Sequence, residues 1–189
     1  IMPLPYAYSG DRAPETLQNS GVPPESFLPV NWLVEDLARH GVASYLSQFQ
    51  GFAHSTYSRM IGRGATVAPH KTLPEALVNM TQTLQRHGGQ AVYFLYFGAI
   101  DTISHDHGPT SAQVDAEIEA CFDTLERWFQ RDAASLPADT LLLLTADHGQ
   151  VAVDPAATLT INQQPEFHKL RPMLRTTRQG QLLTPAGSC

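Results

Sequence analysis

The chain has 189 residues, 42% of them hydrophobic and 16% charged, which is the balance of a soluble globular protein with one sizeable core rather than two complete domains. Its net charge of −6 means that basic residues are not in excess, which argues against nucleic acid as a partner. Two cysteines cannot support a disulfide framework, and no apolar stretch approaches the roughly 18 residues of a membrane span.

The first 30 residues hold 6 of the 14 prolines, so residues 1–30 are predicted to be a loop-rich lead-in. A short helix should follow, with Asn31 as its N-cap and Gly41 just past its end. The stretch "VASYL" then predicts a strand, and residues 48–71 carry no regular pattern.

A capping box of Thr72 and Glu75 opens the next predicted helix, which presents apolar residues at helical spacing and ends at "HGG". The apolar run over 91–97 predicts a strand buried on both faces. A second capping pair, Thr110 with Gln113, should begin a long amphipathic helix. Its inward residues would be Val114, Ile118, Phe122, Leu125 and Phe129.

The apolar run over 140–145 predicts a second buried strand. Helices alternating with buried strands indicate an α/β fold whose sheet is mostly parallel. Beyond Asp154 the pattern weakens into a polar tail with arginines at 171, 175 and 178, which we expect to be a solvated surface. Cys121 should be a buried thiol on the apolar side of its helix.

Acidic and histidine side chains follow both predicted strands. Asp101 and His105 come after the first strand, and Asp147 and His148 after the second. Ligands bind at the carboxyl ends of strands in an open parallel sheet, so these groups should meet at one edge. Carboxylates brought together repel unless a cation separates them, and Asp with His suits zinc, iron or manganese.

The two pairs differ in how they would reach an ion. A loop could curl to turn Asp101 and His105 toward one ion, whereas the adjacent pair needs a turn, which Gly149 permits. Adjacent ligands could also diverge toward two ions. Each motif alone is common, so an alternative is that both bind no metal and are polar caps on buried strands.

The segments "DTISHDHGP" and "LLLLTADHGQ" together resemble the D-x-x-G-H-x-x-G-P and S/T-x-D-H-G-M motifs of the type I phosphodiesterase/nucleotide pyrophosphatase family, within the alkaline phosphatase superfamily. Ser104 replaces the usual Gly and Gln150 the usual Met. The order of the motifs and the strand before each agree with the family. The resemblance covers residues 73–153, which would form the metal-ligand core region.

The resemblance implies an alkaline-phosphatase-like fold, in which helices flank a mostly parallel sheet, and two divalent metal ions, usually zinc. Asp101 and His105 would bind one ion, and Asp147 and His148 the other. Asp106 and His107 fall on variable positions of the motif and are expected outside the ligand set. The implied reaction is a two-step transfer through a covalent intermediate on Thr or Ser, acting on a phosphodiester or nucleotide.

Several parts of the family pattern are missing from this sequence. It has no convincing earlier Asp ligand, and Thr56 and Thr66 lie in the irregular region without an evident helix start. His168 follows His148 by only 20 residues, which is too soon for the remaining His ligand. We therefore expect residues 1–189 to be part of a single, longer metallohydrolase domain, incomplete in this chain, with the nucleophile elsewhere and no activity alone.

Two alternatives remain open at this stage. The whole enzyme could be another hydrolase of the superfamily, such as a phosphomonoesterase, a sulfatase or a phosphonoacetate hydrolase. It could also be a non-catalytic metal-binding or scaffold protein. Cysteine usage slightly favours the cytoplasm, although an export signal could precede these residues.

Overall fold

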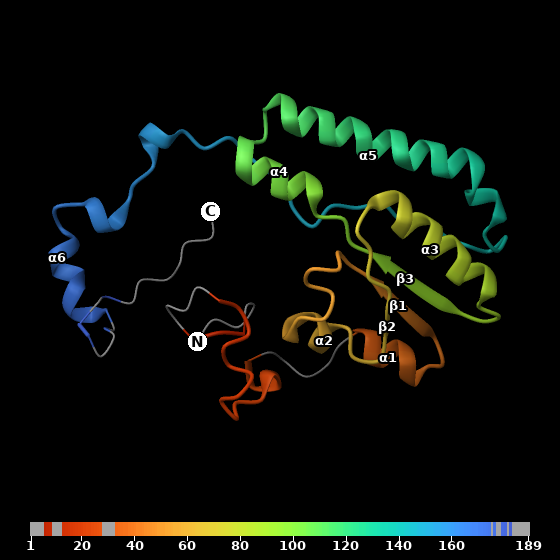
Figure 1. Ribbon diagram of the computed structural model, residues 1–189, viewed down its shortest axis with the longest axis horizontal. Coiled ribbons are helices and arrows are strands. Elements are labelled where there is room, and N and C mark those ends of the chain that lie inside the picture. Colours follow the sequence, from red (N-terminus) through yellow and green to blue (C-terminus); the bar gives the residue numbers. More distant parts are fainter. Residues whose placement is uncertain are drawn as a thin grey trace. The chain divides into compact units, whose positions relative to one another are not determined.

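The computed structural model (Figure 1) describes residues 6–8, 13–27, 33–174, 176, 179–180 and 182. The chain forms two compact units. One comprises residues 23–150, and the other residues 1–22 together with 151–189. The first unit contains the sheet and both Asp/His motifs. That the whole chain belongs to one metallohydrolase domain stays a prediction.

Three parallel strands form the sheet: β1 (Ala43–Ser47), β2 (Thr66–Val67) and β3 (Ala91–Leu95), in the order β2-β1-β3. Tyr45 of β1 faces Tyr93 of β3 on one side and Thr66 of β2 on the other. The parallel sheet with flanking helices confirms the predicted α/β class and is consistent with an incomplete alkaline-phosphatase-like fold.

The helices of the first unit are α1 (Leu33–Arg39), α2 (Thr56–Ile61), α3 (Leu73–Arg86), α4 (Ala99–His107) and α5 (Ala112–Arg131), with 3-10 turns at Pro24–Phe27 and Ala133–Ser135. The other unit contains α6 (Phe167–Leu170) and the 3-10 turns Pro155–Ala157, Ile161–Gln163 and Arg171–Met173. No helix among the described residues is long and apolar enough to cross a membrane.

Helix α3 begins at the predicted cap, because the Glu75 N–H donates to Thr72 Oγ1 (3.4 Å). The Glu75 carboxylate accepts from the Lys71 N–H (2.8 Å), one residue before the Thr72 N–H that a capping box uses. For α5 the predicted cap is off by one residue, since Ser111 rather than Thr110 accepts from the Val114 N–H (3.4 Å). The predicted cap Asn31 lies outside the described residues.

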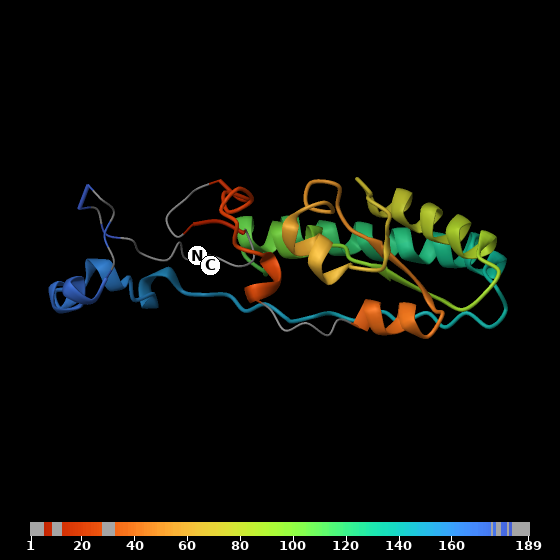
Figure 2. The same cartoon turned by 90° about the horizontal axis from the view of Figure 1, so that it is seen from below.

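The main core lies between α3, α5 and one face of the sheet (Figures 1 and 2). Its buried members are Leu73, Leu77, Met80 and Trp128, and half-buried Cys121 and Leu125 pack against them. Phe122 and Phe129, predicted to face inward, are instead 55% and 62% exposed. The prediction is right for Val114, which is buried, and for Leu125, which packs against the core. At the other two positions Cys121 and Trp128, one residue earlier, face the core instead.

The predicted strand at 140–145 is the main difference between expectation and structure. Residues 141–145 form no strand, and their leucines are exposed. An apolar run indicates that a segment favours burial, but pairing also needs a neighbouring strand edge in register. Strand β3, predicted to be buried on both faces, is only half-buried although it pairs with β1 along its whole length.

The C-terminal tail agrees with expectation where it is described. Arg171 is exposed in a 3-10 turn. Arg175, Arg178 and Cys189 lie outside the described residues.

Candidate metal-binding site

Helix α4 carries the first Asp/His pair directly past the carboxyl end of β3 (Figure 1). Asp101 lies in its first turn, and His105 lies one turn later, with His105 Nε2 at 3.5 Å from Asp101 Oδ1. The expectation that this stretch is a loop was wrong, since the helix ends only at Gly108, which has φ +84°. The four-residue spacing is itself helical and places both side chains on one face.

The second pair reaches the same carboxylate from the segment after residue 145. His148 Nε2 lies 3.9 Å from Asp101 Oδ1 and 3.9 Å from Asp147 Oδ1. His105 and His148 therefore both lie near the Asp101 carboxylate, and Asp147 lies near His148. Their side chains are between 37% and 68% exposed, so solvent and small molecules have access to them.

Gln150 joins the two motifs, and the sequence analysis missed this role. Its amide donates to Asp101 Oδ1 at 2.6 Å. The signal was available, because this position carries an amide where the family motif has Met, a polar replacement beside a predicted ligand. The contact fixes the oxygen of the Asp101 carboxylate that also faces His105 and His148.

The His148 ring is held in an orientation that suits a ligand. Its Nδ1 lies 3.1 Å from the Gly149 carbonyl oxygen, which can only accept a hydrogen bond, so Nδ1 is the donor. In the neutral ring the proton then lies on Nδ1, and Nε2 presents its lone pair toward Asp101 and Asp147.

An aromatic cluster lies at the same edge of the sheet. The Phe52 ring contacts Phe49 at a centroid distance of 6.0 Å and Tyr96 at 6.4 Å. Burial first, and then the negative charges of Asp147 and Asp101, raise the pKa of Tyr96. A Cβ on Gly98 would lie 3.1 Å from Tyr96 Cε1, so this glycine lets the ring cover the start of α4.

The donor set and one of its spacings fit a transition metal. Two ligands about 2.1 Å from a tetrahedral zinc ion are about 3.4 Å apart, close to the 3.5 Å between Asp101 and His105. Both His148 separations are longer, at 3.9 Å. Within the part of the chain that is described, no three His, Cys, Asp or Glu side chains are arranged to hold one ion. The described Asp and His side chains therefore form pairs and not a complete ligand set for one ion.

The remaining candidates do not add to this cluster. Thr56 does begin helix α2, contrary to expectation, with Ser55 as the cap. Its side chain is buried, however, and Oγ1 accepts from the Arg59 guanidinium at 3.2 Å. Thr66 belongs to the short strand β2, and His168 to α6 of the other unit. Asp106 and His107 are exposed on the last turn of α4.

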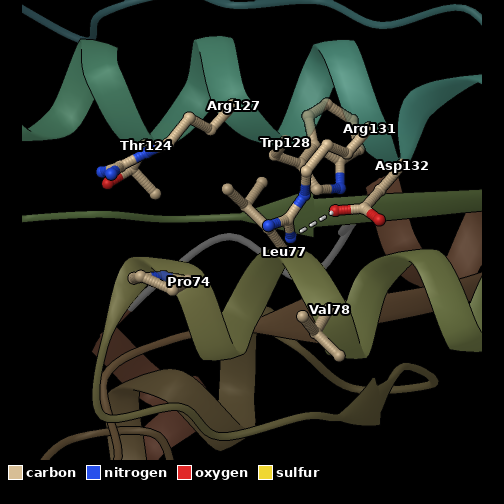
Figure 3. Close-up of a pocket in the computed structure, with 8 residues that line it drawn as sticks. All are labelled: Pro74, Leu77, Val78, Thr124, Arg127, Trp128, Arg131 and Asp132. Atoms are coloured by element: carbon tan, nitrogen blue, oxygen red, sulfur yellow. Dashed lines mark hydrogen bonds and ion pairs between the residues drawn. The ribbon is translucent and has the colours of Figure 1, made fainter.

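A pocket of about 230 Å³ opens between α3 and α5 (Figure 3). Its floor is apolar, with Leu77 and Trp128, while Arg131 and Asp132 form an ion pair of 3.4 Å at its rim. None of the four candidate ligands lines it. The pocket is therefore separate from the Asp/His cluster.

The fold and this cluster define an α/β protein with acidic and histidine side chains gathered past the carboxyl end of a parallel strand. The family model described as type I phosphodiesterase / nucleotide pyrophosphatase matches residues 14–183. The chain belongs to that family, as its two motifs predicted. No curated protein and no solved structure is significantly similar to it.

Proposed function

We propose that this protein serves in the metal-dependent hydrolysis of phosphodiester or nucleotide pyrophosphate bonds. Asp101 and His105 would hold one divalent ion, and Asp147 and His148 a second, with zinc as the first choice. The observation that carries this proposal is the convergence of both motifs on the Asp101 carboxylate, with His105 Nε2 at 3.5 Å and His148 Nε2 at 3.9 Å from the same oxygen. Two ions bound there would stabilise the attacking and leaving oxygens at phosphorus.

The electrostatics of the cluster support the need for cations. Asp101 and Asp147 each place a carboxylate oxygen 3.9 Å from His148 Nε2, and carboxylates at the site would repel a phosphate unless a cation lies between them. Gln150 would keep the Asp101 carboxylate in position, and the Gly149 carbonyl would keep His148 Nε2 directed at the site. Such supporting contacts orient ligands and raise metal affinity.

The aromatic cluster would contact the organic part of the substrate. Phe52 and Tyr96 are 39% and 42% exposed beside the carboxylates, so a small phosphodiester could place its ester group over them while its phosphorus faces the cluster. The family reaction proceeds through a covalent Thr or Ser intermediate. That nucleophile would come from outside this chain, because Thr56 is buried and Thr66 is part of β2.

Zinc titration by calorimetry tests this assignment. The unmodified chain should bind zinc saturably at neutral pH, and Asp101→Ala and Asp147→Ala should each weaken binding at least about tenfold. Asp123→Ala, which removes an exposed acid on α5, is the matched control and should leave binding unchanged. Absence of saturable binding, or binding that neither Asp101→Ala nor Asp147→Ala weakens, would refute the proposed metal site.

The position of the nucleophile has a separate test. With zinc bound, the chain should hydrolyse bis-p-nitrophenyl phosphate no faster than its Asp101→Ala variant. A rate well above that of the variant would show that a nucleophile or activated water is already present in this chain.

A further inference from the structure

The pocket between α3 and α5 combines a buried apolar floor with two arginine side chains (Figure 3). Leu77 and Trp128 are only 3% and 4% exposed, and the pocket of about 230 Å³ opens onto them. The Trp128 indole N–H donates to Thr81 Oγ1 at 2.9 Å, so the ring is held in place before any ligand arrives. Ligand pockets are concave and mostly apolar, with a few polar groups that orient the ligand. This pocket has that composition, and its size suits a ligand with one ring or a short chain.

The polar side of the pocket is positively charged, although the chain as a whole carries a net charge of −6. Arg127 and Arg131 line it from α5, and Figure 3 shows both side chains reaching toward α3. Residues four apart on a helix have Cβ atoms about 5–6 Å apart, so two guanidinium groups can close on one anion. Among the described lining residues only Asp132 is acidic, so two cations and one anion leave the rim with a net charge of +1.

Both guanidinium groups have donors available for a ligand. Arg127 Nε donates to the Asp123 backbone carbonyl at 3.2 Å, and its terminal nitrogens have no ion pair within the described part of the chain. Arg131 Nη2 lies 3.4 Å from Asp132 Oδ2, and the two side chains are 73% and 36% exposed. An exposed ion pair at this distance is weak, so a more highly charged anion can replace Asp132 as the partner of Arg131.

An organic phosphate fits this arrangement better than a carboxylate does. A guanidinium presents its donors as a planar fork that pairs with two oxygens. One such fork occupies both oxygens of a carboxylate, whereas the three terminal oxygens of a phosphate monoester can accept from two forks. The dianion also balances the charge of two arginines. The apolar floor can then contact the organic group of the ester.

We infer that this pocket binds small phosphate monoesters, with the phosphate between Arg127 and Arg131 and the organic group over Leu77 and Trp128. The site is distinct from the Asp/His cluster, because none of the four candidate metal ligands lines it. Binding there does not depend on the proposed function. Hydrolysis of a phosphodiester releases a phosphate monoester, so the pocket takes the class of molecule that the proposed reaction produces, and this connection alone rests on the proposed function.

Titration of the whole 189-residue chain with phenyl phosphate in metal-free buffer tests the inference. In a Trp32→Phe background the indole emission comes from Trp128 alone, and it should change saturably with a dissociation constant of about 1 mM. Inorganic phosphate lacks the apolar group and benzoate lacks the third oxygen, so each should bind at least about tenfold more weakly. No saturable binding of phenyl phosphate, by fluorescence and by calorimetry, would overturn the site. Equal binding of inorganic phosphate or of benzoate would overturn the ligand class.

A set of arginine variants locates the ligand. Arg127→Gln and Arg131→Gln should each weaken phenyl phosphate binding at least about tenfold, because each removes a charged fork. Arg86→Gln changes an exposed arginine of α3 that does not line the pocket, and this matched control should leave binding unchanged. Binding that neither Arg127→Gln nor Arg131→Gln weakens would overturn the inference.

One further variant separates this site from the proposed metal site. Asp101→Ala should bind phenyl phosphate as the unmodified chain does. Loss of binding in Asp101→Ala, with full binding in both pocket variants, would place the ligand at the Asp/His cluster and overturn the inference. Phenyl phosphate binding at the pocket without any zinc binding would support this site and refute the proposed function. Zinc binding without phenyl phosphate binding would refute this site and leave the proposed function intact.

Discussion

The hydrogen bond between α3 and α5 offers a quantitative test of the packing that supports the site. The Trp128 indole N–H donates to Thr81 Oγ1 at 2.9 Å, and the Thr81 hydroxyl donates to the Leu77 carbonyl at 2.9 Å. Both side chains are buried, at 4% and 7% exposure. Thr81→Val keeps the volume but leaves the indole N–H without an acceptor, which should cost about 1–3 kcal/mol of unfolding free energy.

A double-mutant cycle isolates this hydrogen bond from the packing. Trp128→Phe removes the donor together with part of the ring, so its own cost also includes lost contacts. In Trp128→Phe/Thr81→Val neither partner is left alone, and the double variant should be more stable than the sum of the single costs predicts, by about 1 kcal/mol. Urea unfolding followed by far-UV circular dichroism provides the four free energies.

The control is Thr81→Ser, which keeps the hydroxyl. The cycle that combines Thr81→Ser with Trp128→Phe should give a much smaller coupling energy than the cycle with Thr81→Val, because the serine hydroxyl still accepts from the indole N–H. A valine coupling within about 0.3 kcal/mol of zero, the usual limit of additivity for independent sites, would refute the reasoning that this bond stabilises the contact between α3 and α5.

Two further predictions concern single residues. Burial lowers the pKa of His70, an effect that Glu75 partly opposes, and its Nδ1 lies 2.9 Å from Ser47 Oγ in the core. Because the unfolded chain binds this proton more readily, the stability contributed by neutral His70 is complete above about pH 6.5 and is lost as the pH falls below it. Urea unfolding between pH 7.5 and 5.5 should show a steeper loss of unfolding free energy for the unmodified chain than for His70→Asn. Equal slopes for the two chains would contradict this prediction. Ser111→Ala should lower the free energy of unfolding by about 1 kcal/mol, because it removes the cap on α5, whereas Thr110→Ala should have little effect. A larger loss of stability in Thr110→Ala than in Ser111→Ala, measured by urea unfolding, would support the cap predicted from the sequence.

Local features of the fold could be predicted from the sequence because they depend on neighbours along the chain. The start of α3 is set by Thr72 and Glu75, which satisfy backbone groups within one turn of themselves. The two motifs identified the family because four Asp and His residues in a fixed order carry chemical information without any knowledge of packing. The strand before Asp101 could also be predicted locally, because its apolar run lies within the strand itself.

Contacts between distant segments were decided only by the tertiary structure. Nothing local shows that Gln150 reaches Asp101, 49 residues earlier in the chain, or that Phe122 and Phe129 face away from α3. The leucines at 141–144 illustrate the reason most clearly. Their composition specifies a strong tendency toward burial, but burial as a strand requires a free edge of the sheet in the right register, and that edge exists only once the rest of the unit has folded.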